Sequence, residues 1–299
     1  MNLLVIGTRG SPLALIQTQS IIDRLKQEYP DLEIKTKIIK TTGDQLSDYE
    51  HLEAIQQRGI FTKEIEKKLL EAEIDLAVHS LKDMPVEMPQ GLEIAAIPPR
   101  EDPRDCWVSL HYPHPDCLEP GAIVAVGSPR RANQLLRKRP DLRVVPIRGN
   151  VETRLKKLRE NKEWMGTILA MAGIKRLGID LSSFFCTYLG LDWMLPAPGQ
   201  GALALETRQG DKRTQDLVQF LNDFPSACEV CAERSFLYEL GGGCRTAVGA
   251  MAKVERSKLV LYGIWWPQGS LRPKEGKVVG QIQEAKKLGQ ELAHLLRKL

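Results

Sequence analysis

The chain has 299 residues, a length that suggests two domains or three small ones. Lysine and arginine number 42 and aspartate and glutamate 38, so the net charge is only +4, while 42% hydrophobic and 27% charged residues are ordinary for a globular protein. These values exclude a disordered chain, a collagen-like repeat and a polybasic tail of the kind that binds nucleic acid.

The cysteines and the apolar segments indicate a protein of the cytoplasm. Six cysteines at irregular spacing are too few for a disulfide scaffold, which favours reduced thiols. The N-terminus has no basic region before its short apolar run, so we interpret residues 3–6 as a strand and not as part of a signal peptide. The longest apolar stretch, residues 164–174, is eleven residues long, whereas a membrane span needs roughly 18. We expect no membrane contact.

The first hundred residues predict alternating strands and helices. Apolar or alternating runs indicate strands at residues 3–6, 33–40, 74–78 and 92–97. Ser11 and Pro12 predict the start of a helix, because serine caps helices and proline is tolerated in the first turn. One face of this helix carries apolar or small side chains at helical spacing and the chain leaves it before Pro30, and a second helix is predicted over residues 61–70. The buried face of the first helix consists of Ala14, Thr18, Ile21 and Leu25.

Pro98 and Pro99 mark a boundary, after which the same pattern begins again. Strands are predicted at residues 122–126, 144–147 and 167–171, helices from Pro129 and from about residue 150, and a turn at Gly173. Residues 127–129 repeat the Gly-Ser-Pro order of residues 10–12 at the start of a helix. Each such turn places free backbone N–H groups and the positive end of a helix dipole beside arginines, which favours a bound anion.

Residues 196–201, rich in proline and glycine, form a second linker. Beyond it we predict a strand at residues 202–205, helices at 213–221 and 227–240, and strands at 247–254 and 259–266. A final amphipathic helix carries Leu288, Leu292, Leu295 and Leu299. These elements predict a small third domain of the α+β class, behind two domains of the α/β class.

Basic residues are concentrated between positions 130 and 159. This segment has eleven lysines and arginines against Asp141 and Glu152, a local excess of +9. Residues 137–139 and 156–157 fit a solvated helix surface. The arginines at strand-to-helix junctions are better placed for a ligand, because such junctions line the crevice of an open α/β sheet and arginine binds carboxylate or phosphate in a bidentate manner. The residues in question are Arg130, Arg131, Arg148 and Arg154.

The chemistry of the ligand follows from what surrounds this charge. Nucleic acid could use the same arginines, but aromatic side chains are not interleaved with them and the rest of the chain is acidic. We therefore expect a compact polycarboxylate or phosphate, and no nucleic acid.

Residues 78–85 leave a buried strand and enter a loop that ends in Pro85. Asp83 beside Lys82 has two interpretations: a surface ion pair, or an acid/base or cation-stabilising group in a cationic cleft. For His79, at the end of the strand, a hydrogen-bonded structural role is favoured over metal ligation.

The cysteines Cys228 and Cys231 have CxxC spacing, which raises zinc binding or redox chemistry. The pair lies within a predicted helix and only Cys244 could join it, so the pattern argues weakly for a metal. Cys244 follows three glycines that would let a ligand approach its thiol closely, although a tight turn around a buried cysteine explains the same pattern.

Motifs over nearly the whole chain resemble those of the porphobilinogen deaminase family, also called hydroxymethylbilane synthases, and occur in the family's order. They are residues 7–14 (GTRGSPLA), 58–64 (RGIFTKE), 79–85 (HSLKDMP), 100–105 (REDPRD), 148–150 (RGN), 172–178 (AGIKRLG), 198–202 (PGQGA) and 242–244 (GGC). The resemblance implies two α/β domains built like periplasmic binding proteins and a small C-terminal α+β domain. It places the first domain at 1–98 and 198–216, the second at 99–197 and the third at 217–299.

The resemblance also implies an activity and a cofactor. Family members are transferases of heme and porphyrin biosynthesis that join four porphobilinogen molecules head to tail, with loss of ammonia, into the linear tetrapyrrole hydroxymethylbilane. The primer is a dipyrromethane bound through a thioether, here to Cys244. Asp83 matches the catalytic aspartate, and a carboxylate suits the azafulvenium cation left when ammonia departs. Porphobilinogen is then the partner of a monomeric cytoplasmic enzyme.

The matching binding positions divide into two groups. Those expected at the cofactor are Lys82, Asp83, Ser128, Arg131 and Arg154, with Cys244 as the covalent link. Those expected at the substrate are Arg9, Ser11, Phe61, Arg130, Arg148 and Arg176. No metal site is implied.

Four positions depart from the family pattern. Arg58 stands where many members have lysine, Gly127 and Pro129 replace a serine and a leucine around Ser128, and Ala247 stands where a proline is usual.

Two other classes of protein share some of these features. A solute-binding protein would have a similar fold and anion cleft but no use for Cys244, whereas a redox or zinc protein would depend on Cys228 and Cys231.

Overall fold

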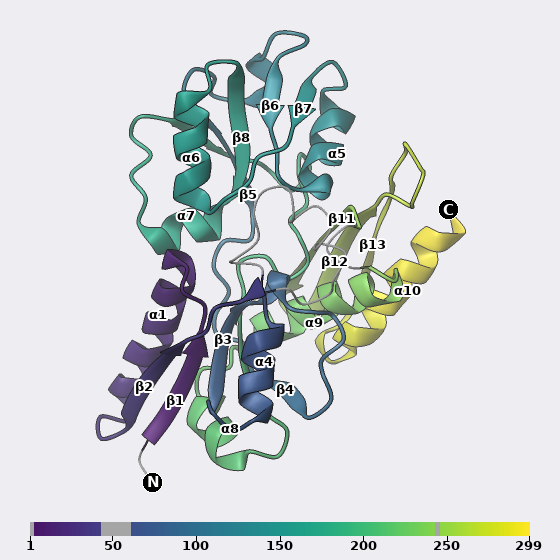
Figure 1. Ribbon diagram of the computed structural model, residues 1–299. Helices are drawn as coiled ribbons and strands as arrows, with labels where there is room; N and C mark the ends of the chain where they lie inside the picture. Colours follow the sequence, from purple (N-terminus) through teal and green to yellow (C-terminus); the bar gives the residue numbers. More distant parts are fainter. Residues whose placement is uncertain (1–2, 43–60, 243–245) are drawn as a thin grey trace.

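A computed structural model describes residues 3–42, 61–242 and 246–299 of the chain (Figure 1). The strands form two five-stranded sheets and one three-stranded sheet. In Figure 1 the sheet that contains β1 lies below, the sheet that contains β6 lies above, and the smallest sheet lies to the right. Among the residues described, none of the helices is long and apolar enough to cross a membrane.

The first sheet has the strand order β2-β1-β3-β10-β4. Its strands are β1 (Leu3–Thr8), β2 (Glu33–Ile38), β3 (Leu76–Ser80), β4 (Leu92–Ala96) and β10 (Leu203–Arg208), and its helices are α1 (Pro12–Glu28), α4 (Lys63–Leu70) and α8 (Lys212–Gln219). β1 is parallel to β2 and β3, whereas β10 pairs antiparallel with β3 and β4. In the sequence, β10 follows all the strands of the second sheet. The chain therefore leaves the first domain after β4 and returns to it with β10.

Helix α1 forms as the sequence predicts. The Ser11 side chain accepts a hydrogen bond from the Ala14 N–H, and Pro12 occupies the first helical position. Ala14, Thr18, Ile21 and Leu25 are buried as expected, and so is Gln17. The helix ends at Glu28, before Pro30, because proline disfavours a helical conformation in the residue that precedes it.

The second sheet has the order β7-β6-β8-β5-β9. It comprises β5 (Asp105–Ser109), β6 (Ile123–Ala125), β7 (Arg143–Val145), β8 (Trp164–Ala170) and β9 (Phe185–Tyr188), with α5 (Pro129–Lys138), α6 (Val151–Glu160) and α7 (Met171–Leu177). The predicted turn at Gly173 is wrong, because this residue lies inside α7. The packing of α7 against α1 does not require this glycine, because a Cβ at Gly173 would make only ordinary contacts, 3.6 Å from the Val151 side chain and 3.9 Å from the Leu13 side chain.

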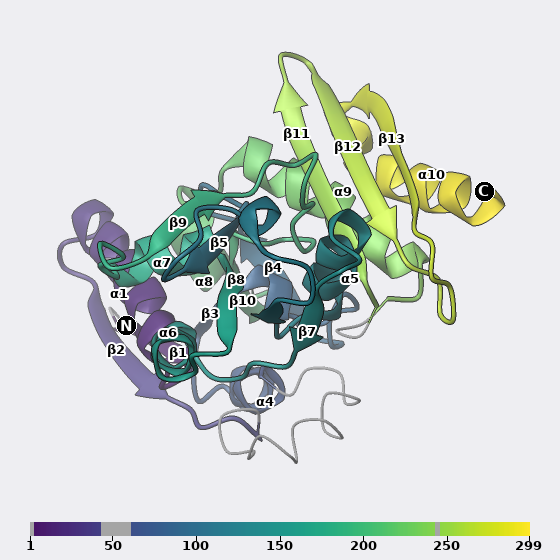
Figure 2. The same ribbon diagram turned by 90° about the horizontal axis from the view of Figure 1, so that it is seen from above.

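The third sheet, β11 (Val248–Glu255), β12 (Lys258–Trp265) and β13 (Lys274–Gln281), is antiparallel. Helices α9 (Phe224–Glu239) and α10 (Ala285–Lys298) pack on one of its faces, as Figure 2 shows from above. The sequence did not predict β13. Leu288 and Leu292 of α10 are buried against the sheet, while Leu295 and Leu299 are exposed. The prediction of two α/β domains and a small α+β domain is confirmed.

Two linkers join the first two sheets, residues 97–104 and residues 189–202. The Glu101 N–H donates to the Gly201 carbonyl at 3.2 Å, so the linkers run side by side. Gly201 has φ +87°, and a Cβ there would lie 2.3 Å from the Glu101 carbonyl oxygen. Glycine is therefore required both by the backbone conformation and by the close approach of the linkers.

Candidate active site

The predicted site residues follow the ends of parallel strands in both α/β domains. Arg9 and Ser11 come after β1, and Lys82 and Asp83 come after β3, in the short 3-10 helix η1 (Leu81–Asp83). In the second domain the α5 and α6 helices begin where β6 and β7 end. Parallel strands end at the same edge of a sheet, so each domain gathers its polar groups at one edge.

Charges from the two domains influence one another, which shows that these edges face each other. The Arg131 and Arg130 guanidiniums act on the pKa of Lys82, and Asp83 acts on the pKa of Arg154. Helices α1 and α7 meet at the side of the same region (Figure 1). We call the residues that share this space the interdomain cluster: Lys82, Asp83, Asp105, Arg130, Arg131, Arg148 and Arg154.

A pocket at the edge of the first sheet contains four of the predicted residues. Arg9, Ser11, Phe61 and Asp83 line it, and the Arg9 guanidinium lies 4.3 Å from the centre of the Phe61 ring. Asp83 is half-buried, yet within the described chain its carboxylate has no hydrogen-bond or ion-pair partner. The predicted alternative of an ion pair with Lys82 therefore does not form in this structure, and the Asp83 carboxylate is available to a ligand.

Lys82 contributes a cation whose charge depends on pH. Lys82 is exposed, yet crowding by protein atoms from both domains desolvates its ammonium and lowers the pKa of Lys82 to about 8, with Asp83 opposing this change and Arg131 adding to it. The ammonium is thus largely protonated at neutral pH. It loses its charge in mildly alkaline solution.

Asp105 holds Arg130 and Arg131 in place. Its Oδ2 accepts from Arg130 Nη1 at 2.7 Å, its Oδ1 accepts from Arg131 Nη2 at 2.7 Å, and the Gln200 amide donates to the same Oδ1 at 2.9 Å. Burial by itself would raise the pKa of Asp105, but the two arginines outweigh it and hold the pKa well below its usual range. Arg130 Nε is buried without a partner among the described atoms, so the pair still has an unused donor.

The positive charges of Arg148 and Arg154 are balanced less well than those of Arg130 and Arg131. Arg154 Nε donates to the Gly149 carbonyl at 2.7 Å, and in the described part of the chain neither guanidinium is paired with an acid. Burial, followed by the charges of Arg131 and Arg148, lowers the pKa of Arg154 to about 10. These guanidiniums therefore repel one another, and a bound anion would offset the repulsion.

The start of α5 explains two departures from the family pattern. Ser128 is the N-cap of α5, but its side chain makes no capping hydrogen bond, so the hydroxyl is available for another contact. Pro129 takes the first helical position, where its missing N–H has no consequence. A Cβ at Gly127 would lie 2.5 Å from the Ile147 carbonyl oxygen, so a serine at this position requires a local shift of the backbone.

Arg176 lies beside the linkers and not in the interdomain cluster. It is half-buried on α7, and its Nη2 donates to the Gly201 carbonyl at 2.7 Å. Burial lowers the pKa of Arg176, with Glu101 as the opposing charge. The structure thus places Arg176 where it joins the second domain to the second linker.

Glu233 of α9 is a further buried carboxylate, which the sequence analysis did not single out. It accepts hydrogen bonds from both Arg100 Nη atoms at 2.7 and 2.9 Å, from the Gly199 N–H at 2.7 Å and from the Ala252 N–H at 2.8 Å. These partners belong to the first linker, the second linker and β11. One side chain therefore fixes the third domain to both linkers. Nothing in the local sequence indicates this role, because its partners are distant along the chain.

The other sequence candidates have simple surroundings. His79 Nε2 and Glu206 Oε2 are 3.0 Å apart and buried, which agrees with the structural role favoured for His79. Cys228 and Cys231 lie on α9, and the described residues contain no group of three or more His, Cys, Asp or Glu side chains able to hold a metal. Cys244 and Arg58 lie outside the described residues.

Two family models match the chain. Porphobilinogen deaminase, dipyromethane cofactor binding domain, matches residues 4–216, and porphobilinogen deaminase, C-terminal domain, matches residues 227–298. Among solved structures, a periplasmic VFT2 domain of Bordetella pertussis BvgS is 14% identical with a TM-score of 0.43, covering 73% of this chain and 86% of that one.

Curated relatives match over almost the full length and carry the name porphobilinogen deaminase. The Clostridium novyi protein is 41% identical over 297 residues, 99% of this chain and 98% of that protein. The Thermus thermophilus protein is 46% identical over 294 residues, 98% and 95% of the two chains. The Clostridioides difficile protein is 42% identical over 299 residues, 100% and 98% of the two.

Proposed function

The chain belongs to the porphobilinogen deaminase family, and on that premise we propose that it joins four porphobilinogen molecules head to tail, with loss of ammonia, into hydroxymethylbilane. We further propose that it does so as a cytoplasmic monomer on a free small molecule, without nucleic acid. The domain limits that go with this proposal are 1–98 with 198–216, 99–197, and 217–299. The placement of β10 in the first sheet supports the split first domain.

The family's dipyrromethane, when bound, supplies the pyrrole carbon to which the first substrate is joined. The structure is suited to such a group, because pyrrole side chains carry carboxylates and the interdomain cluster has arginines without acidic partners in the described chain. We assign cofactor contacts to Lys82, Ser128, Arg131 and Arg154, with Cys244 as the covalent attachment. Two observations on the described residues support this assignment. The Ser128 hydroxyl makes no capping hydrogen bond, and Arg154 uses only its Nε, which leaves its two Nη atoms for a carboxylate.

The incoming substrate carries an acetate and a propionate, and the chain offers it a second set of cations. Arg9 and Ser11 line the pocket that Asp83 shares, with the Phe61 ring packed against Arg9. We also assign substrate contacts to Arg130 and Arg148 of the second domain and to Arg176, which lies beside the two linkers. A guanidinium that holds a carboxylate out of bulk water contributes about 1.5–3 kcal/mol, so several such contacts fix the orientation of the ring.

Asp83 is the group that we assign to catalysis. Its carboxylate is half-buried, lines the pocket and has no partner within the described protein, and this observation carries the proposal. When ammonia leaves porphobilinogen, positive charge spreads onto the pyrrole nitrogen. A fixed carboxylate beside that N–H accepts its hydrogen bond and stabilises the charge more strongly as it grows. The surrounding arginines cannot do this, because their charge has the wrong sign.

The variant Asp83→Asn tests this role by removing the charge at nearly constant shape. Losing the stabilisation of the cation should raise the barrier by on the order of 3 kcal/mol or more, a fall in kcat of about a hundredfold or greater. Asp23→Asn, an exposed aspartate on α1, is the matched control and should keep wild-type kcat. The thermal unfolding midpoint should be unchanged in both variants. An Asp83→Asn enzyme with most of its kcat would refute the assignment.

A further inference from the structure

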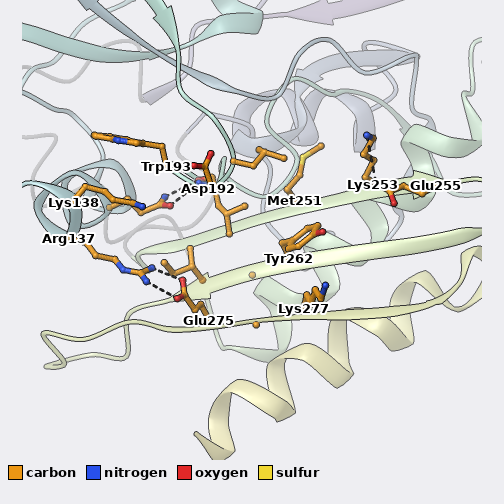
Figure 3. Close-up of a pocket in the computed structure, with 16 residues that line it drawn as sticks. Arg137, Lys138, Asp192, Trp193, Met251, Lys253, Glu255, Tyr262, Glu275 and Lys277 are labelled. Carbon is orange, nitrogen blue, oxygen red and sulfur yellow. Dashed lines mark hydrogen bonds and ion pairs between the residues drawn. The ribbon is translucent and has the colours of Figure 1, made fainter. Parts of the chain in front are cut away.

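A cavity of about 530 Å³ lies between the second domain and the open face of the third sheet (Figure 3). On the domain-2 side it is lined by the end of α5, by residues 191–193 and by Leu195, and on the other side by β11, β12 and β13. Helices α9 and α10 cover the opposite face of this sheet (Figure 2). The cavity shares none of its lining residues with the interdomain cluster. Ligand sites occur preferentially at such domain boundaries.

The floor of the cavity is apolar and contains an accessible aromatic ring. Strand register places Met251, Tyr262 and Lys277 in one row across the three strands. Met251 is 8% exposed and Ile264 is 3% exposed, whereas Tyr262 is 38% exposed. A planar ring that covered Met251 and Tyr262 would remove apolar surface from water and stack on an aromatic face. The floor therefore suits a small aromatic molecule.

The charges at the rim favour an anion. Arg137 and Glu275 neutralise each other through two hydrogen bonds of 2.5 and 2.7 Å, and Lys253 lies 3.7 Å from Glu255. Two lining cations, Lys138 and Lys277, have no ion-pair partner among the described residues. One lining acid, Asp192, is also unpaired there, which leaves a surplus of one positive charge.

Helix α5 connects this cavity to the interdomain cluster. Its first turn holds Arg130 and Arg131 on Asp105, and its last turn supplies Lys138 and Arg137 to the rim of the cavity. Between them, the Gln134 amide exchanges two hydrogen bonds with the Leu195 backbone, at 2.8 and 2.9 Å. One helix therefore contacts both the cavity and the guanidiniums of the interdomain cluster.

We propose that this cavity binds a small aromatic carboxylate, with its ring against Tyr262 and Met251 and its carboxylate attracted by the two lysines of the rim, Lys277 next to Tyr262 and Lys138 at the end of α5. The occupant contacts the second and third domains at once. Its binding changes the rate of turnover through α5, without contact with the reacting groups.

Calorimetric titration with 2-naphthoate tests the site directly, and it requires no activity. We expect saturable binding to the holoenzyme, at least tenfold weaker binding of the neutral analogue 2-naphthalenemethanol, and at least tenfold weaker binding of naphthoate to the Lys138→Gln/Lys277→Gln variant. Lys258→Gln, on β12 but outside the cavity, is the matched control and should bind as the wild type does. Absence of naphthoate binding would overturn the proposal.

The interdomain cluster is also cationic, so the test must separate the two locations. Naphthoate that bound the cluster would compete with porphobilinogen and would be unaffected by the double lysine substitution, and that result would also overturn the proposal. We expect instead that naphthoate changes kcat of the wild type non-competitively. The double variant should have ordinary kcat without naphthoate and no response to it. Binding at the lysines with no change in kcat would overturn the coupling through α5.

Discussion

Replacing Glu233 with glutamine should destabilise the junction of all three domains. The carboxylate is fully buried and accepts four hydrogen bonds, two of them from Arg100. Glutamine keeps one acceptor oxygen, but its NH₂ group would face an Arg100 donor and a backbone N–H. Among the described residues, the Arg100 guanidinium, whose side chain is 4% exposed, would keep only Glu229 at 3.7 Å as an acidic neighbour.

The size of the effect follows from these contacts. Breaking a buried pair costs about 3–5 kcal/mol, and the remaining attraction of Glu229 brings our expectation to about 3 kcal/mol. For a chain of this size, that corresponds to a fall of about 6–12 °C in the thermal unfolding midpoint. Scanning calorimetry measures it, and Glu291→Gln, an exposed site on α10, should stay within about 1 °C of the wild type. A Glu233→Gln midpoint equally close to the wild type would show that the junction does not depend on this charge.

Two further predictions concern the cations of the site. Because the pKa of Lys82 is about 8, its positive charge is present below that pH and lost above it, so kcat/KM for porphobilinogen should fall as pH rises through 8. Lys82→Arg should keep its rate to higher pH, and identical pH profiles for the two enzymes would contradict this role. The second prediction concerns leucine substitutions of the arginines, analysed by native mass spectrometry after mixing with porphobilinogen. A substitution at a cofactor contact should give apoenzyme, and one at a substrate contact should give holoenzyme stalled with too few rings. The cofactor pair is Arg131 and Arg154, the substrate pair is Arg9 and Arg148, and one shared outcome for all four would disprove the division.

Local sequence signals predicted most of the regular elements because those elements depend on local physics. Ser11 and Pro12 start α1, Asn150 caps α6 by accepting from the Thr153 N–H at 2.8 Å, and apolar runs become buried strands. The strands that were missed, β5, β9 and β13, are short or carry alternating exposed side chains. Their pairing is decided by neighbours from distant parts of the chain. Gly173 shows the reverse error, since a glycine inside a helix was interpreted as a turn.

The part of the candidate site that lies at strand ends could be predicted, because strands can be recognised from the sequence. Arg130, Arg131 and Arg154 were identified because they follow strands at the start of helices, and the structure places Arg154 near Asp83 and the other two near Lys82. What holds them was not predictable. Arg130 and Asp105 are 25 residues apart, and Glu233 and Arg100 are 133 apart, so each contact exists only in the folded chain. The sequence therefore predicted which residues gather at the strand ends better than which residues hold them in place.

The intact mass of the purified protein is the most direct test of the account. In protein produced by cells able to make porphobilinogen, the mass should exceed the value calculated from the sequence by one dipyrromethane, and further single-ring increments should appear after porphobilinogen is added. The excess and the increments should both be absent from Cys244→Ser. A wild-type mass equal to the calculated value, unchanged by porphobilinogen, would contradict the proposed primer and the polymerisation that depends on it.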